Sequence, residues 1–190
     1  MQCRVLAVAN QKGGVGKTAT AITLAAGLAA RSKRTLVIDL DPQANATGNL
    51  AVGQRTPGIA EVLQGEVTLR EACSETGRNG LSLIAGGSRM ATWSLEGRRT
   101  CPWRTEDTKK SFDFVILDCP PSISGPTILA LQESDELIIP VQSEYLALEG
   151  LSSLLRAVDS VRGTTGTLQI RYLITMFDRR NNLSGEVEAE

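Results

Sequence analysis

Aromatic side chains are scarce in this sequence, and their scarcity already narrows the fold class. They make up 4% of the 190 residues, whereas hydrophobic residues in total reach 42% and charged residues 22%. That balance is typical of a soluble globular chain whose core is built from small aliphatic residues. Such residues favour a buried parallel sheet covered by Ala-rich helices. The length fits one domain over residues 1–190.

A strong charge of either sign is also missing. The formal net charge is −1, so no overall field draws the chain to nucleic acid or to anionic lipid. Any DNA binding therefore depends on a local patch, or on one that dimerisation creates. The residues that offer such a patch are Arg31, Lys33, Arg34, Arg98, Arg99, Lys109, Lys110, Arg179 and Arg180.

The sequence further lacks paired cysteines, a long apolar run and a leader. Its four cysteines are scattered with no C-x-x-C pair, which argues against a zinc site or a disulfide framework. No apolar stretch approaches the roughly 20 residues of a membrane-spanning helix. The first residues pass from a short apolar run straight into glycines, unlike a signal peptide. We therefore expect a cytoplasmic protein with no membrane partner.

What the sequence does have is a regular alternation of β-branched runs and Ala/Leu-rich segments. The runs predicted as strands are 4–9, 35–39, 81–85, 112–117, 136–141 and 169–176. Apolar residues at helical spacing predict helices over 16–31 and 146–161. The expected fold is α/β, a doubly wound, mostly parallel sheet with helices on both faces.

Two stretches do not follow this pattern. Residues 86–110 are polar and basic, hold both tryptophans, and predict a variable connection with room for one short helix. Near the C-terminus, Ser184 is a candidate N-cap, with Glu186 and Glu188 in the first turn of a helix. The chain stops at Glu190, so we expect a C-terminal part that is shortened.

A glycine-rich segment follows the first predicted strand and opens the first predicted helix. Glycines let the backbone bend so that successive N–H groups face inward and hold phosphate oxygens, next to the positive end of the helix dipole. Lys17 is placed to reach the β- and γ-phosphates, and the Thr18 hydroxyl to bind magnesium. The alternative is an ordinary glycine-rich turn. The predicted nucleotide-binding residues here are Lys12, Gly13, Gly14, Val15, Gly16, Lys17, Thr18 and Ala19.

Acidic residues end two other predicted strands. Asp39 and Asp41 stand at the carboxyl end of one strand, where doubly wound sheets place their ligands. They are candidates to orient a water molecule, and the alternative is a turn capped by an aspartate before Pro42. Asp118 follows the apolar run 114–117, the position of a Walker B carboxylate that binds magnesium with Thr18.

These segments resemble the ParA/Soj branch of the deviant Walker A ATPases. The matching motifs are QKGGVGKT (11–18), LDPQANAT (40–47) and ILDCPPS (116–122), with weaker ones at 139–151 and 175–184. Gln11 stands where the general P-loop has glycine, and Lys12 is the extra lysine of the variant. The resemblance implies ATP/ADP and Mg²⁺ as cofactors and an ATP-dependent sandwich homodimer. It also implies that Lys12 reaches the partner's nucleotide in trans, as an arginine finger does.

The same resemblance implies further roles and partners. Asp41 would activate the attacking water with Asp39 in support, and Met176 and Asp178 would contact the base. Met176 equally fits the last core residue of its strand. Non-specific DNA and a ParB-like protein that stimulates slow hydrolysis would be the partners, with the protein associated with the nucleoid if DNA binding is retained. Relatives continue into a C-terminal region with DNA-binding basic residues that this sequence lacks.

Three functions remain open from the sequence. The first is a slow switch ATPase for partition of plasmids, chromosomes or other cargo. The second is an ATP-binding dimerisation module with little hydrolysis. The third is an electron-transfer ATPase similar to the iron protein of nitrogenase, which needs cysteine ligands such as Cys101 and Cys119 for a shared Fe–S cluster.

Overall fold

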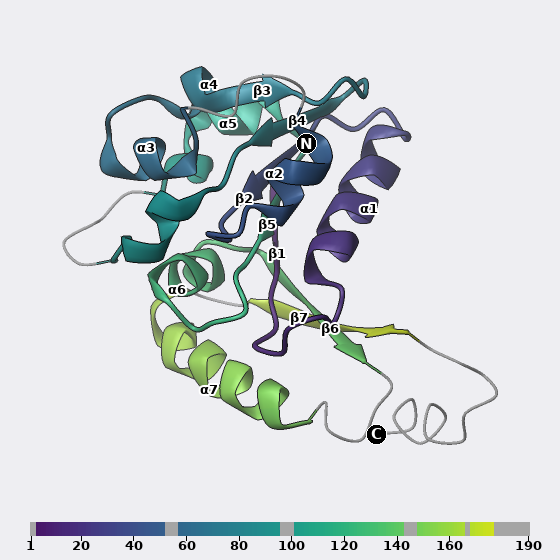
Figure 1. The fold of residues 1–190 in the computed structure, drawn as a ribbon, viewed down its shortest axis with the longest axis vertical. Helices are drawn as coiled ribbons and strands as arrows, with labels where there is room; N and C mark the ends of the chain where they lie inside the picture. Colours follow the sequence, from purple (N-terminus) through teal and green to yellow (C-terminus); the bar gives the residue numbers. More distant parts are fainter. Residues whose placement is uncertain (1–2, 52–56, 96–100, 143–147, 166–167, 177–190) are drawn as a thin grey trace.

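The chain folds around a central sheet in which the carboxyl ends of all strands except β3 lie at the same end of the sheet (Figure 1). The computed structural model describes residues 3–51, 57–95, 101–142, 148–165 and 168–176. Its strands, as described, are β1 (Arg4–Val8), β2 (Thr35–Asp39), β3 (Cys73–Glu75), β4 (Leu81–Ile84), β5 (Phe114–Asp118), β6 (Glu136–Gln142) and β7 (Gln169–Thr175).

The strands lie in the order β3-β4-β2-β5-β1-β6-β7. Every neighbouring pair is parallel except β3 with β4, which is antiparallel. The predicted doubly wound, mostly parallel sheet is therefore confirmed. The order reverses direction around β1, and ligands of such sheets bind beyond the carboxyl ends of the strands at that point.

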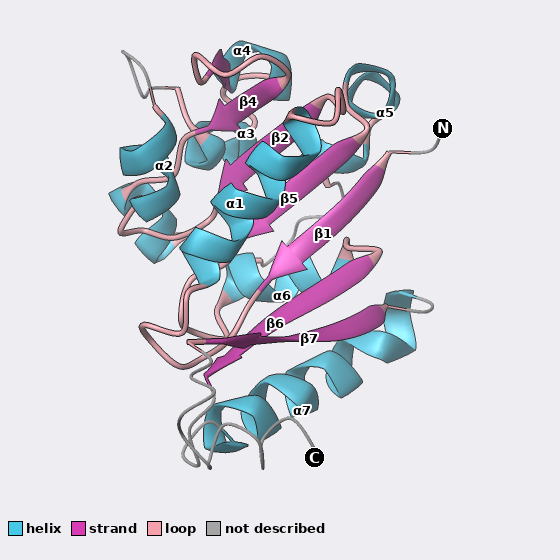
Figure 2. Cartoon of the chain, turned by 90° about the vertical axis from the view of Figure 1, so that its right-hand side faces the viewer, coloured by secondary structure: helices cyan, strands magenta, loops and turns pink. Residues whose placement is uncertain are grey.

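Helices cover both faces of the sheet, and Figure 2 shows α1 lying across the front of it. The α-helices are α1 (Lys17–Ala29), α2 (Asn45–Leu50), α3 (Ile59–Gln64), α4 (Leu69–Ala72), α5 (Glu106–Ser111), α6 (Gly125–Gln132) and α7 (Leu148–Thr165). Two short 3₁₀ turns, η1 (Ser88–Thr92) and η2 (Pro102–Arg104), lie between β4 and α5.

The hydrophobic core consists of two clusters, one on each face of the sheet, because successive residues of a strand point to opposite faces. On β5, Ile116 packs with residues of α1 and α2, whereas Val115 and Leu117 pack on the other side with α3, α6 and α7. The helix face of α1 is built from alanine, with Ala21 and Ala25 fully buried. Small side chains let this helix lie close to the strands, which fits the low aromatic content.

The six predicted strands are all present, but the sequence missed β3 and the short helices. A three-residue strand shows no alternation, and helices of four to eight residues span barely two turns, so neither has a readable period. α1 begins at Lys17 rather than residue 16, because Gly16 is its left-handed N-cap. Residues 146 and 147 of the other predicted helix, and the predicted cap at Ser184, lie outside the described residues.

The stretch 86–110 is more ordered than predicted. Its described part holds η1, η2 and α5 rather than one short helix, and both tryptophans are buried in the core. The Trp93 ring packs closely on Gly125 of α6, where an added Cβ would lie only 3.3 Å from the ring carbons. Arg104 donates to the Glu133 carbonyl and pairs with Asp135 at 2.9 Å. The connection is therefore fixed to α6 and to the start of β6.

The described helices include none with both the length and the apolar character needed to cross a membrane.

Candidate nucleotide-binding site

The candidate site lies beyond the carboxyl ends of β1, β2 and β5. Asp118 is in register with Val8 on one side and with Asp39 on the other. The backbone continues this alignment past the strand ends, since Leu40 N–H donates to the Asp118 carbonyl and Cys119 N–H to that of Val8. The fold thus brings the glycine-rich loop and the acidic segments of residues 39–41 and 118 to one edge.

The glycine-rich loop has the backbone shape of an anion cradle. Gly14 and Gly16 both adopt left-handed conformations, with φ of 76° and 90°. A Cβ at Gly13 or Gly14 would meet no other atom within 4 Å, so the space beside the loop is open. α1 starts directly after the loop and has no side-chain cap, which leaves its first N–H groups available to an anion.

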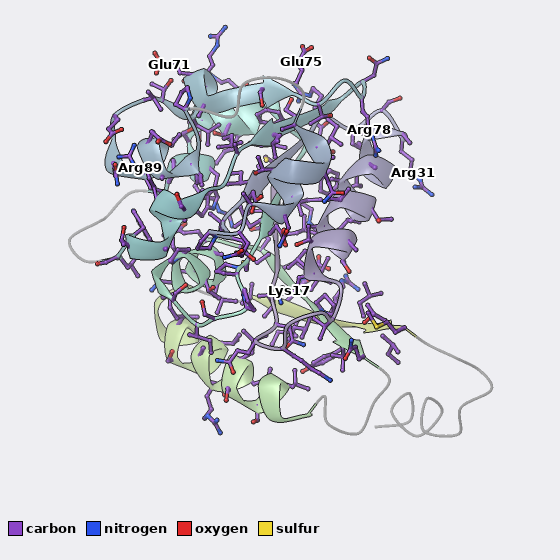
Figure 3. All side chains as sticks on the ribbon, viewed as in Figure 1. Lys17, Arg31, Glu71, Glu75, Arg78 and Arg89 are labelled. Atoms are coloured by element: carbon purple, nitrogen blue, oxygen red, sulfur yellow. The ribbon has the colours of Figure 1, made fainter. Side chains whose placement is uncertain are left out.

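Lys17 is the buried cation of the site. Its side chain lies at the foot of α1 (Figure 3), and the residue is only 8% exposed. Its Nζ donates to the Lys12 carbonyl at 2.9 Å. Burial lowers the Lys17 pKa, while Asp118 and Asp41 act in the opposite direction. A buried ammonium flanked by carboxylates is suited to receive the multiple negative charges of a polyphosphate.

Asp118 is the buried carboxylate that has no hydrogen-bond partner. It is fully buried, and both of its oxygens lack a protein partner. The pKa of Asp118 is raised to about 7, chiefly by burial and also by the charges of Asp39 and Asp41, which together outweigh the lowering effects of Thr18 and Lys17. The Thr18 hydroxyl is near enough to lower this pKa but does not meet hydrogen-bond geometry. Buried polar groups are rarely left without a hydrogen-bond partner, so this carboxylate is a candidate to bind an ion or a ligand.

A magnesium ion fits this arrangement. Within the part of the chain that the structure describes, no three His, Cys, Asp or Glu side chains gather into a metal cage. Mg²⁺ in nucleotide sites needs only one or two protein ligands, because phosphate oxygens and waters complete its shell. The Thr18 hydroxyl and the unpaired Asp118 carboxylate are chemically suited to hold it.

Asp39 has a different environment from Asp118. One of its oxygens accepts from the N–H of Asp41, and the other accepts from the N–H and hydroxyl of Thr47 at 2.8 and 2.7 Å. Thr47 in turn accepts from Gly86 N–H at 2.9 Å. Asp39 therefore joins the end of β2, the start of α2 and the segment after β4. Its contacts are those of a residue that shapes the loop carrying Asp41.

Asp41 lies at the tip of that loop and is 7% exposed. Its backbone is held by Asp39, and its Oδ1 accepts from Gln43 N–H at 2.9 Å, an Asx-type turn. Ala44 follows in a left-handed conformation before α2 begins. The loop is thus rigid, and Asp41 is near enough to Lys17 and Asp118 to affect the pKa of both.

An apolar groove of about 630 Å³ leads away from the loop between α1 and β7. Gly16 and Ala19 line it on the side of α1, and Met176 lines it just after β7. Met176 is 65% exposed, which excludes the alternative that it is a core residue. Its predicted neighbour Asp178 lies outside the described residues.

Lys12 lies on the loop with its N–H donating to Asn10 Oδ1 at 3.1 Å. Its carbonyl, not its ammonium, is the group that contacts Lys17. Four residues with contacts near the site had no predicted role, namely Thr47, Gly86, Gln142 and Thr175. Thr47 falls inside the motif at 40–47, and Gln142 and Thr175 fall inside the two weaker motifs, but the motifs alone assigned no role to them.

Most described members of the predicted basic patch have acidic or backbone partners. Arg34 pairs with Asp113 at 3.1 Å and donates to the Lys110 carbonyl, Arg31 bonds the Gly27 carbonyl, and Lys109 pairs with Glu106. Figure 3 shows Arg31 just past the end of α1 that is opposite to Lys17. Arg98, Arg99, Arg179 and Arg180 lie outside the described residues.

The cysteines do not support an Fe–S site. Cys119 is 1% exposed, and burial raises the pKa of its thiol, as it does for Cys101. Cluster ligands are thiolates, and a cluster shared between two subunits needs them at the surface. The electron-transfer interpretation therefore has no structural basis in these two residues.

Comparison with known proteins gives a consistent result. A family model described as an AAA domain matches residues 3–170. The chromosome partitioning protein ParA of Caulobacter vibrioides is 40% identical, over 97% of this chain and 73% of the relative. The chromosome-partitioning ATPase Soj of Thermus thermophilus is 43% identical, over 98% of this chain and 75% of the relative.

Solved structures agree with the fold. A structure named cobyrinic acid a,c-diamide synthase from Mycobacterium smegmatis, with bound ADP and magnesium, has a TM-score of 0.86 and 34% identity. That match covers 98% of this chain and 80% of the other. A plasmid partition protein from Borrelia burgdorferi has a TM-score of 0.83 and 25% identity, covering 100% and 88%.

Proposed function

Because this chain belongs to the ParA/Soj family of chromosome-partitioning P-loop ATPases, we propose that it binds ATP with magnesium, hydrolyses it slowly and uses the cycle as a switch in partition. The observation that carries this proposal is Asp118, a buried carboxylate without a hydrogen-bond partner beside Thr18 and Lys17. A carboxylate kept in that state costs stability, and a nucleotide-bound cation would compensate for it. Relatives at 39–43% identity are chromosome-partitioning proteins, which favours partition over synthesis as the function.

The proposed binding step uses groups that already face the site. The N–H groups of residues 13–19 would hold the phosphate oxygens, and Lys17 would exchange its bond to the Lys12 carbonyl for one to the β- and γ-phosphates. Magnesium supplies charge neutralisation to the phosphates when it is bound by Thr18 and Asp118. Ala19 and Met176, at the start of the groove, would contact the base or ribose.

The proposed hydrolytic step is in-line attack of water on the γ-phosphorus, which breaks the bond to the β–γ bridging oxygen. Asp41 would orient the water and accept its proton, with the rigid turn at Gln43 fixing its position. Asp39 would act by holding that turn. Lys12 of a second subunit would neutralise charge on the transferring phosphoryl group, a contribution of about 10³–10⁵ in rate where such a cation is inserted.

The proposed switch has partners outside one chain. An ATP-bound homodimer would place two copies of each basic segment together and so give non-specific DNA binding in the cytoplasm, at the nucleoid. A ParB-like protein would stimulate hydrolysis. The remaining alternative is a dimerisation module that binds ATP but scarcely hydrolyses it.

Steady-state phosphate release tests the enzymatic proposal. Wild type should release phosphate from ATP only with magnesium, and Lys17→Ala should neither bind nor hydrolyse ATP, because the phosphate cation is gone. Lys109→Ala, a surface lysine paired with Glu106 at 2.7 Å, is the matched control and should behave as wild type. ATP affinity retained in Lys17→Ala would contradict the P-loop assignment. Tight ATP binding by wild type without phosphate release would favour the dimerisation module.

A further inference from the structure

We propose that Thr175, the last residue of β7, is a positioning residue that holds the phosphate loop in its binding shape, with Gln142 in support. This inference rests on the proposed nucleotide binding. It gives a role to the two weaker motifs, at 139–151 and 175–184, whose contribution the site described above leaves open.

The loop needs donors on its outer side. In an anion cradle the N–H groups turn inward, so the carbonyl groups of the same residues turn outward and must find partners there. The Thr175 hydroxyl donates to the Val15 carbonyl at 2.9 Å, and Gln142 Nε2 donates to the Gly14 carbonyl at 3.3 Å. Val15 is fully buried, so water cannot readily replace Thr175 as the partner of its carbonyl, whereas the bond from Gln142 to Gly14 is exposed.

The pairing of β6 with β7 places the two donors, Gln142 and Thr175, side by side. Gln142 and Thr175 are opposite each other in the β6–β7 register. β6 continues past the end of β1, whose last paired residue Val8 faces Ile138. Along this extension β6 follows the loop, because Ala9 N–H donates to the Ile138 carbonyl and Asn10 Nδ2 to the Pro140 carbonyl at 2.7 Å. Gln142 makes the next contact of the same series.

Thr175 contacts the loop through both branches of its side chain. Its hydroxyl has one proton, and the Val15 carbonyl at 2.9 Å is a nearer acceptor than the Val141 carbonyl at 3.3 Å. Its methyl group lies 3.9 Å from the position of a Cβ on Gly16, the left-handed residue that ends the loop. The hydroxyl sets the direction of a carbonyl, whereas the methyl group only fills space. These two contributions are separable by substitution.

Loss of the hydroxyl should therefore weaken phosphate binding. Without a donor the buried Val15 carbonyl turns toward another partner, and the adjoining N–H group of Gly16 turns out of the cradle with it. An unpaired buried acceptor of this kind corresponds to about a 5- to 30-fold change in an equilibrium constant.

The test measures the dissociation constant of ADP with magnesium, by calorimetry, for wild type, Thr175→Val and Thr175→Ser. Valine keeps the shape and removes the hydroxyl, and serine keeps the hydroxyl and removes the methyl group. We expect about 5- to 30-fold weaker binding in Thr175→Val and recovery of most of the affinity in Thr175→Ser. Melting temperatures without nucleotide show whether both variants fold.

Equal affinity in wild type and Thr175→Val, or an equal loss in the valine and serine variants, would overturn the inference while leaving nucleotide binding intact. Absence of ADP binding in wild type would instead overturn the proposed function, and this inference with it. If Thr175→Val does not fold, Gln142→Leu removes the other donor at the same level. Wild-type ADP affinity in that variant would overturn the inference as well.

Discussion

At the scale of single residues, Asp118 shows how a binding site is built at the expense of stability. Its charge is buried without a hydrogen bond, so the folded state favours the protonated form. The pKa rises from its ordinary value of 3.8 to about 7. Between these values the unfolded chain has lost the proton and the folded chain keeps it. The contribution of Asp118 to stability is therefore fully present below pH ~4, is lost as the pH rises to ~7, and stays lost above that.

Asp118→Asn should accordingly stabilise the nucleotide-free protein at pH 8. We expect about 1–4 kcal/mol, since the substitution removes an unpaired buried charge. Denaturant unfolding at several pH values measures this, and the decline in stability between pH 4 and 7 should be shallower in the variant. Some decline should remain, because burial also raises the Asp39 pKa. Asp107→Asn, an exposed substitution at the start of α5, is the control and should change little.

Asp41 gives a second prediction at this scale. Its side chain is held in a turn at the edge of the site, near Lys17 and Asp118. Asp118 is part of strand β5, whereas Asp41 lies in the loop after β2. Asp41→Ala should therefore bind ATP with nearly wild-type affinity and lose most of its phosphate release, because the groups proposed to hold the phosphates are unchanged while the group proposed to position the water is removed. Calorimetry and steady-state turnover separate these effects. Unchanged turnover would mean that another group positions the water.

At the scale of elements, the Asp41 loop depends on how closely the segment after β4 approaches β2. A Cβ at Gly86 would lie 2.7 Å from the Asp39 carbonyl oxygen and 2.8 Å from its carboxyl carbon. Asp39 is fully buried, and its carboxyl group is held by hydrogen bonds from Thr47. Gly86→Ala must therefore displace either β2 or α2. The close approach explains why a glycine stands at a position that no turn conformation requires.

We expect Gly86→Ala to lower the free energy of unfolding by about 1–3 kcal/mol, the usual range for overpacking, and to reduce turnover through the displaced Asp41 loop. Gly87→Ala is the matched control, because a Cβ there meets nothing within 4 Å. Thermal unfolding and phosphate release of the two variants make the comparison. Equal behaviour of both variants would show that the segment moves freely and that the close contact has no consequence.

The same elements show what the sequence was able to predict. Residues within one motif, such as Lys17 and Thr18, are close in sequence, so their spacing was sufficient to place them at a strand-to-helix turn. Asp39 and Asp41 were placed by a rule about the ends of parallel strands, and Asp118 by its position directly after an apolar run. The contact of Thr47 with Gly86 crosses 39 residues and that of Thr175 with Val15 crosses 160. Periodicity predicts that a strand exists but not which distant side chain lies beside it.

The prediction of a variable connection over residues 86–110 was wrong for another reason. Weak periodicity suggested a loose connection, but Trp93 and Trp103 are anchored in the core by size rather than by spacing. Two buried aromatic rings fix an irregular chain without any repeating pattern. In a sequence with so few aromatic residues, the position of both tryptophans in one segment was the better indicator of packing.

At the scale of the whole molecule, one side of the phosphate loop remains open. A Cβ added at Gly13 or Gly14 would meet no atom of the described chain within 4 Å, and Lys12 stands just before them. Inserted cations work where the site excludes water, which a loop at the surface of one subunit does not achieve. An ATP-bound second copy facing this edge would exclude water and bring its own Lys12 to the phosphates.

Sedimentation with ADP and with ATP–magnesium tests this arrangement directly. Wild type should be monomeric with ADP and dimeric with ATP, because the γ-phosphate is the group that a lysine from the partner would contact. Lys12→Ala should bind ATP but stay monomeric or dissociate more readily, whereas Lys109→Ala, on α5, should dimerise as wild type does. A Lys12→Ala dimer with normal turnover would mean that Lys12 does not act across the interface. A wild type that binds ATP but remains monomeric would mean that the switch operates within one subunit, and its DNA binding would then have to come from a single chain whose net charge is −1.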